Sequence, residues 1–147
     1  MSTAQEKLNF HKVKIDKGET IKSLIKKYQL DVEDCNLQKF YKLNKLTPTS
    51  KLDINKSYFI PVLLFDFNGK SIRSSIDIDD WQVAYRIDLY NKKMLDAGKR
   101  KKNIKDSKII WVPYHELYCK EEIVVKQTSK RIFPIFGKKY EKNSSIG

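Results

Sequence analysis

The fold of this chain is decided by residues 10–62, which read FHKVKIDKGETIKSLIKKYQLDVEDCNLQKFYKLNKLTPTSKLDINKSYFIPV. Residues 11–16 alternate in polarity and place Val13 and Ile15 on one face, which is the pattern of a half-buried β-strand. Gly18 breaks this strand, and the two residues after it are typical of a helix start. The stretch is therefore predicted to begin with a strand that turns directly into a helix.

The predicted helix after Gly18 buries a single face. Its apolar residues follow the i, i+3, i+4, i+7 spacing of one helical stripe, and they are Ile21, Leu24, Ile25 and Tyr28. A second helical segment is expected to begin at Asp31, a good N-cap residue with Asp34 in the capping-box position. The residues expected on its inner face are Val32, Cys35, Phe40 and Leu43.

A short strand at residues 58–60, ended by Pro61, is expected to close this unit. The order strand, helix, helix, strand predicts the α+β class. The whole chain is predicted to consist of a polar lead-in at residues 1–9, the unit at 10–62, a small α+β region at 63–136 and a linker or tail at 137–147.

The small α+β region has its own local signals. The Asn68-Gly69 dipeptide suits a type I′ turn and predicts a hairpin between its apolar flanks. Residues 81–97 have helical spacing, residues 77–80 lead into this helix, and residues 109–112 form a continuous apolar run typical of a strand. The region is therefore predicted to contain one hairpin and one long helix.

Short motifs in residues 10–62 resemble those of a LysM domain, a βααβ module that binds N-acetylglucosamine-containing glycans. The matching positions are Gly18, Glu19, Thr20, Ile21, Tyr28, Asn44, Leu46, Pro48, Leu52, Ile54, Asn55, Ile60 and Pro61. The resemblance covers about a third of the chain. It departs from the family pattern at Glu19, where the family usually has aspartate, and at residues 36–39, which lengthen the second helix.

The resemblance implies a shallow glycan-binding groove between the first turn and the loop before the final strand. Carried onto this sequence, the groove residues are Gly18, Glu19, Thr20, Ile21, Asn44, Leu46, Thr47 and Pro48. N-acetyl groups need an apolar recess with backbone donors and acceptors, which such loops provide. A structural alternative stays open, in which Gly18 turns the chain, Thr20 caps the helix and Leu46 fills the core.

The region after residue 62 resembles the leader of bacterial N-acetylmuramoyl-L-alanine amidases that also begin with LysM. The matching segments are residues 68–74, 79–81, 90–91, 111–115 and 133–137. The resemblance implies that a zinc-dependent catalytic domain would follow and that this chain is a targeting portion. Trp81 and Trp111 are expected in the core of the region. Residues 132–136 are predicted to be extended because Pro134 interrupts their apolar run.

Metal and catalytic signatures are weak in this sequence. His115-Glu116 with Cys119 partly matches a zinc-binding helix, but the second histidine is replaced and His11 is the one other histidine. The carboxylates at residues 77–80 lack the glycine and distal glutamate of a calcium loop, and capping of the following helix with favourable contact to its dipole explains Asp79 and Asp80. We therefore expect no metal, no cofactor and no catalytic activity in this chain.

The net charge of +12 favours anionic partners, and nucleic acid, anionic lipid and wall polymers all qualify. The run of four basic residues at 99–102 lacks interleaved aromatics, so nucleic acid is disfavoured and an exposed loop is expected.

No apolar run is long enough for a membrane span, and no signal-peptide core is visible. One bridge between Cys35 and Cys119 is an open alternative, but free, buried thiols are expected.

These observations predict non-catalytic binding of peptidoglycan or a chitin-like glycan, in the cell envelope or periplasm if the protein is exported. A cytoplasmic or machine-delivered location is the alternative where no signal peptide acts. The other functional hypothesis is an adaptor that uses the LysM fold to dock a protein partner, as LysM-like units do in phage tails and contractile injection machinery.

Overall fold

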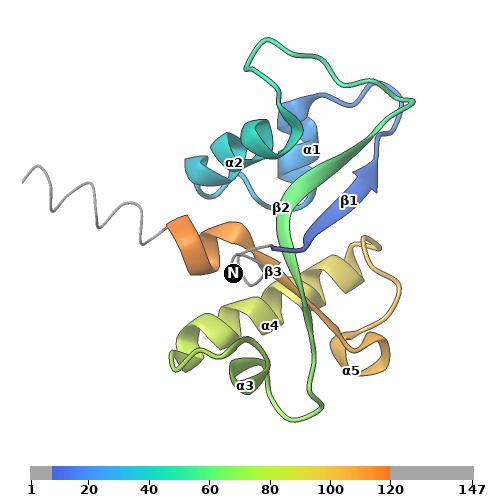
Figure 1. Cartoon of the computed structure of the whole chain (residues 1–147). Coiled ribbons are helices and arrows are strands. Elements are labelled where there is room, and N and C mark those ends of the chain that lie inside the picture. The colour runs from blue at the N-terminus through green and yellow to red at the C-terminus, as the bar shows by residue number, and fades with distance from the viewer. Residues whose placement is uncertain (1–7, 120–147) are drawn as a thin grey trace, which may run out of the picture. The chain divides into compact units, whose positions relative to one another are not determined.

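A computed structural model describes residues 8–119 of the chain (Figure 1). The chain divides into two compact units, Met1–Leu117 and Tyr118–Gly147. The elements are β1 (Phe10–Lys14), α1 (Ile21–Lys27), α2 (Asp34–Asn44), β2 (Ser57–Asp66), α3 (Ile72–Ile76), α4 (Trp81–Asp96), α5 (Ile104–Ser107), β3 (Ile109–Pro113) and the π-helix η2 (His115–Cys119). The α+β class is confirmed. The predicted extended segment at 132–136 and the tail at 137–147 lie outside the described residues.

The three strands form one antiparallel sheet in the order β1-β2-β3. The long central strand β2 pairs with β1 through its first part, where Lys14 lies opposite Ser57, and with β3 through its second part, where Asp66 lies opposite Ile109 (Figure 1). The prediction that this strand ends at Pro61 is wrong. The register between β1 and β2 shifts around Pro61, so the sheet does not need the N–H that proline lacks.

The predicted order strand, helix, helix, strand is confirmed by β1, α1, α2 and β2. The second helix begins later than predicted, at Asp34, and Glu33 precedes it without a side-chain cap, so the expectation that Asp31 caps it is wrong. Val32 therefore precedes the helix and is 65% exposed, contrary to its predicted inner position. Phe40 is fully buried, as predicted.

The predicted hairpin around Asn68-Gly69 does not form. The Asn68 side-chain oxygen accepts hydrogen bonds from the backbone N–H groups of Lys70 and Ser71, 2.8 and 3.2 Å away. Ser71 then caps α3 by accepting a bond from Ser74 N. The turn therefore leads into a helix instead of a returning strand, and β2 pairs with the distant strand β3.

The long helix α4 confirms the predicted helix, and Asp80 caps it by accepting from the N–H groups of Gln82 and Val83. Trp111 is buried as predicted, but Trp81 is 65% exposed, so its predicted core position is wrong. Trp81 lies two residues before Val83, which begins the buried stripe, and therefore faces the opposite side of the helix.

One hydrophobic cluster joins β1, α1, α2, β2, α4 and β3. Its buried members are Val13, Ile15, Ile21, Leu24, Ile25, Tyr28, Leu30, Phe40, Tyr58, Ile60, Val62, Tyr90, Met94 and Trp111. Tyr90 on α4 ties this cluster to the end of α1, because its hydroxyl donates to the carbonyl of Tyr28 at 2.8 Å. Residues from both predicted regions thus share the core.

The two cysteines differ from the sequence-based expectation. Cys35 and Cys119 are both disulfide-bonded, so the prediction of free thiols is wrong.

Within the part of the chain that the structure describes, no helix has the length and apolar character needed to cross a membrane.

Candidate functional site

The two segments of the predicted groove lie toward the same end of the β1-β2 strand pair. The first segment is the turn that follows β1, and the second is the loop between α2 and β2. Lys14 near the end of β1 pairs with Ser57 at the start of β2, so the turn leaves the sheet where the loop enters it (Figure 1). The topology therefore brings residues 18–21 and 44–48 to the same end of the β1-β2 pair.

The turn is held by a charged side chain that folds back on it. Gly18 has a φ of +82°, a left-handed conformation that favours glycine. The Glu19 carboxylate accepts from the N–H of Asp16 at 3.1 Å and pairs with Lys27 at 2.8 Å. Burial lowers the pKa of Lys27, but hydrogen bonds to Glu19 and Asp16 outweigh this and raise it overall. Glu19 thus fixes the turn, and its side chain is only 8% exposed.

The two residues after Glu19 begin helix α1. Thr20 forms a reciprocal capping box with Ser23, in which each side chain accepts a hydrogen bond from the other residue's backbone N–H at 3.1 and 2.8 Å. Ile21 is buried in the hydrophobic core. Thr20 is exposed while it caps, so it is open to a ligand, whereas the Ile21 side chain belongs to the scaffold.

Replacing Thr20 with alanine is expected to lower the free energy of unfolding by about 1 kcal/mol, because the cap of α1 is lost. Urea unfolding followed by circular dichroism measures this change. Thr20→Ser keeps the hydroxyl and serves as the matched control, with an expected loss well below that of alanine. Equal stability of the alanine variant and the wild type would show that the capping box contributes nothing.

The second segment consists of the last residue of α2, Asn44, and the loop that follows it. The side-chain amide of Asn44 is fully hydrogen-bonded, whereas part of the loop is exposed. The Asn44 amide donates to the carbonyls of Phe40 and Phe59 at 2.9 and 2.8 Å, and its oxygen accepts from Phe59 N at 2.9 Å. Leu46 is half-buried against the core. Thr47 and Pro48 are exposed. Asn44 therefore fastens α2 to β2, and the following two residues form the accessible part of the loop.

The eight predicted groove residues thus divide by role. Glu19, Ile21, Asn44 and Leu46 hold the turn, the core and the loop in place. The other four of the eight are exposed, and they are Gly18, Thr20, Thr47 and Pro48. A ligand here would meet a glycine turn, a hydroxyl at each segment and a proline ring, together with exposed backbone groups.

His115 and Glu116, from the segment that partly matches a zinc-binding helix, both contact side chains on other helices. The Glu116 carboxylate binds the Arg86 guanidinium on α4 through two contacts to Nε at 3.1 Å. His115 Nδ1 lies 2.9 Å from the buried amide nitrogen of Asn36. Among residues 8–119, no group of three or more histidine, cysteine or acidic side chains could hold a metal ion.

The basic run at 99–102 contains one buried cation, which corrects the expectation of a wholly exposed loop. Arg100 is 7% exposed and lies over the Trp111 ring, with its guanidinium carbon 5.0 Å from the ring centroid. Its guanidinium donates to Asn91 Oδ1, to Ser107 Oγ at 2.7 Å and to the Ile109 carbonyl at 3.1 Å. In the sequence, Asn91 stands at helical spacing from the apolar residues that form the buried face of α4. A polar residue at such a position needs hydrogen-bond partners, and this was the one sequence signal for a buried polar network.

His11 lies beside this network, with its ring centroid 4.5 Å from that of Trp111. Burial, and secondarily the positive charge of Arg100, lowers the pKa of His11. Folded His11 therefore stays neutral at pH values where the unfolded chain, with a pKa of 6.5, already binds a proton. Stability is expected to be maintained above pH 6.5 and to fall as the pH drops from 6.5 through the lowered value.

Urea unfolding at pH 7 and pH 5 tests this expectation. Histidine is the side chain whose ordinary pKa lies between these two values, and the chain has only one other histidine. His11→Phe keeps an aromatic ring at this position but removes the titrating imidazole. The loss of unfolding free energy between pH 7 and pH 5 should therefore be smaller than in the wild type. The same pH dependence in both proteins would assign it to groups other than His11.

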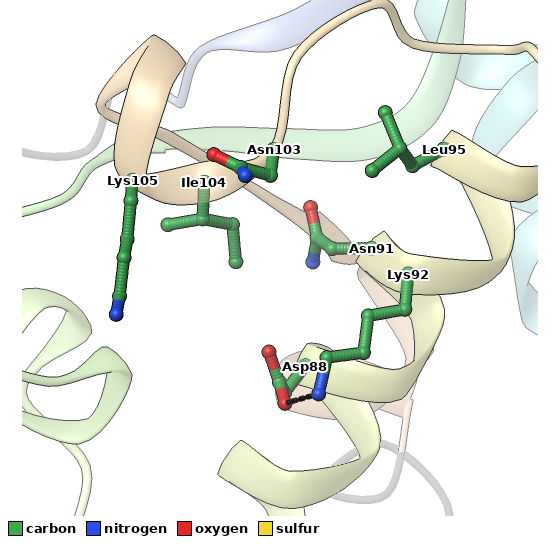
Figure 2. A pocket seen from close by; sticks show the side chains of 7 residues that line it. All are labelled: Asp88, Asn91, Lys92, Leu95, Asn103, Ile104 and Lys105. Atoms are coloured by element: carbon green, nitrogen blue, oxygen red, sulfur yellow. Dashed lines mark ion pairs between the residues drawn. The ribbon is translucent and has the colours of Figure 1, made fainter.

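A surface hollow of ≈ 420 Å³ lies between α4 and α5 (Figure 2). Leu95 and Ile104 supply its apolar part, and the charged side chains of Asp88 and Lys92 form an ion pair at 3.0 Å on its wall. Lys105 extends along its other side from α5 (Figure 2). The hollow is distinct from the segments of the predicted groove, since none of its lining residues belongs to residues 18–21 or 44–48.

No protein-family model, curated protein or solved structure matches this chain. The functional interpretation therefore rests on its own residues and geometry, and on the resemblance of its motifs.

Proposed function

We propose that this chain binds peptidoglycan or a related N-acetylglucosamine-containing glycan without catalysis, as the targeting portion of a cell-wall hydrolase system. One observation carries the proposal. The β1-α1-α2-β2 arrangement brings the LysM-like turn and loop to one end of a strand pair, where four of the eight predicted groove residues are exposed.

The chemistry of this end suits a neutral, amide-bearing sugar. Gly18 leaves open space where a side chain would stand, so a sugar ring can approach the backbone there. The Pro48 ring offers apolar surface for an N-acetyl methyl group, while the Thr20 and Thr47 hydroxyls offer hydrogen bonds. So few anchors predict weak binding by a single groove, which repeated sites on a polymer would strengthen.

The state of the cysteines supports a location in the cell envelope. Cys35 and Cys119 are disulfide-bonded. Disulfides persist in oxidising compartments and are rare in the reducing cytosol. The basic surface of the chain also suits the anionic polymers of a bacterial wall.

Co-sedimentation with insoluble peptidoglycan and with chitin tests the proposal. We expect the wild type to sediment with at least one polymer at moderate salt, and Thr47→Asp/Pro48→Asp to lose at least about tenfold in affinity, which corresponds to 1.4 kcal/mol. Both positions are exposed, so the fold should remain intact. Gln82→Asp on α4 is the matched exposed control and should bind like the wild type. Failure of the wild type to sediment with either polymer would contradict the proposal.

A second candidate function, a protein-docking adaptor, is favoured by the outer face of α4. Trp81 and Tyr85 lie one helical turn apart and are 65% and 57% exposed. Exposed aromatics are enriched at the centres of protein interfaces. This function predicts a stoichiometric protein complex without retained glycan, which Trp81→Ala/Tyr85→Ala abolishes while Thr47→Asp/Pro48→Asp leaves it intact.

A further inference from the structure

A second surface hollow, also of ≈ 420 Å³, lies over the sheet beside the basic loop 99–102. Each strand contributes to its lining, through His11 on β1, Asp66 on β2 and Trp111 on β3. Arg100, Lys101 and Lys102 complete its charged side. The size is within the range of small-molecule sites, about 300–1,000 Å³. None of its lining residues belongs to the predicted glycan groove.

Within residues 8–119, the buried cation in this hollow has no compensating negative charge. The acceptors that this part of the chain offers to Arg100 are neutral: the amide of Asn91, the hydroxyl of Ser107 and backbone carbonyls. Among residues 8–119, no carboxylate oxygen lies within ion-pair distance of its guanidinium. Burial lowers the pKa of Arg100, which reflects the cost of holding this charge away from water. A buried charge of this kind attracts an external counter-charge.

The rest of the lining strengthens that attraction. Lys101 and Lys102 line the hollow and are exposed, so their flexible side chains can reach toward an anion there. Asp66 is the acidic residue of the lining, so three cations outnumber one anion. The apolar surface of Leu64, Ile109 and Trp111 keeps water away from one side, and charge interactions become stronger where water is excluded.

We propose that this hollow is a second binding site, separate from the glycan groove, for a phosphate or carboxylate group carried on a small organic moiety such as a sugar. The anionic group lies between Lys101, Lys102 and the Arg100 edge, and the moiety that carries it rests on the apolar side of the hollow beside His11 and Trp111. The two lysine ammonium groups can donate charge-assisted hydrogen bonds to such a group, and the guanidinium of Arg100 adds its positive charge nearby.

Trp111 and His11 provide site-specific reporters. The chain has two tryptophans and two histidines, so Trp81→Phe leaves Trp111 as the single tryptophan, which can be excited selectively at wavelengths where tyrosine does not absorb, and His115 serves as an internal control in NMR spectra. The Trp81→Phe protein is titrated with inorganic phosphate, glucose 6-phosphate and glucuronate, at constant ionic strength set by sodium chloride. Glucose is the neutral control.

We expect a saturable change in Trp111 fluorescence, together with shifts of the His11 ring signals, for at least one anion with a dissociation constant below about 1 mM. The anion that saturates at the lowest concentration identifies the group as phosphate or carboxylate. Lys101→Glu/Lys102→Glu should weaken binding at least tenfold, whereas Lys70→Glu, a charge change at another exposed site, should leave it unchanged. Asp66→Asn should tighten binding.

Three results would overturn the proposal: no saturable response to any of the anions, an equal response to glucose, or undiminished binding by Lys101→Glu/Lys102→Glu. Circular dichroism of each variant confirms that it is folded. The outcome is independent of polymer sedimentation, so this site and the glycan groove can fail separately.

Discussion

Replacing Asn91 with leucine is expected to lower the free energy of unfolding by about 4 kcal/mol. The buried Asn91 amide makes four hydrogen bonds, each contributing about 1 kcal/mol. Its nitrogen donates to the carbonyls of Ile87 and Trp111 at 2.7 Å, and its oxygen accepts from Trp111 N at 2.9 Å and from Arg100. Leucine has a similar volume but leaves the Arg100 guanidinium and the Trp111 backbone with fewer partners.

Asn91→Asp separates the two halves of this network. It keeps the oxygen that receives Arg100 and Trp111 N, but it replaces the donating nitrogen with an oxygen that faces the carbonyls of Ile87 and Trp111. The new ion pair with Arg100 offsets part of this cost, so the expected loss is about 2 kcal/mol, smaller than for leucine. Urea unfolding of the wild type and both variants measures the series. A leucine variant as stable as the wild type would show that the network does not stabilise the fold.

Replacing Phe40 with alanine is expected to cost about 4 kcal/mol, the usual range for removing a fully buried aromatic side chain being 3–5 kcal/mol. Phe40 has no exposed surface and lies in the core cluster, with its ring centroid 6.4 Å from that of Tyr58 on β2. Its loss would leave a cavity between α2 and the sheet, on which the loop of the candidate groove depends.

The Phe40 series has two controls. Phe40→Leu fills most of the volume and should cost less than half as much as alanine. Gln38→Ala changes an exposed residue of the same helix and should stay within about 0.5 kcal/mol of the wild type. Thermal or urea unfolding measures all three variants. Equal losses for alanine at positions 38 and 40 would contradict the assigned core.

Local pattern was enough to predict the elements whose buried face has a clear period. The stripe of α1, with Leu24 and Ile25 at its centre, and the cap at Asp80 are both read from neighbouring residues, and both are confirmed. The hairpin at Asn68-Gly69 was wrong because the Asn68 side chain bonds to the following backbone. The partner of β2 comes from a strand more than 40 residues further along the chain, which local signals do not identify.

The predicted groove shows the same limit of local sequence signals. The resemblance of motifs identified the turn and loop residues, and the pairing of β1 with β2 puts these two segments at the same end of the strand pair. Which of them are exposed depended on tertiary contacts, such as the three bonds that occupy Asn44. Arg100 belongs to a run of four basic residues, and only the packing of α4, α5 and β3 around it distinguishes it from its exposed neighbours.

The most direct test of the central proposal is an NMR titration of the ¹⁵N-labelled protein with an oligomer of N-acetylglucosamine. We predict saturable amide shifts concentrated at residues 18–21 and 44–48, with little change at Trp81 and Tyr85 on the outer face of α4. An absence of shifts at saturating oligomer, or shifts confined to α4, would contradict glycan binding by the turn and loop.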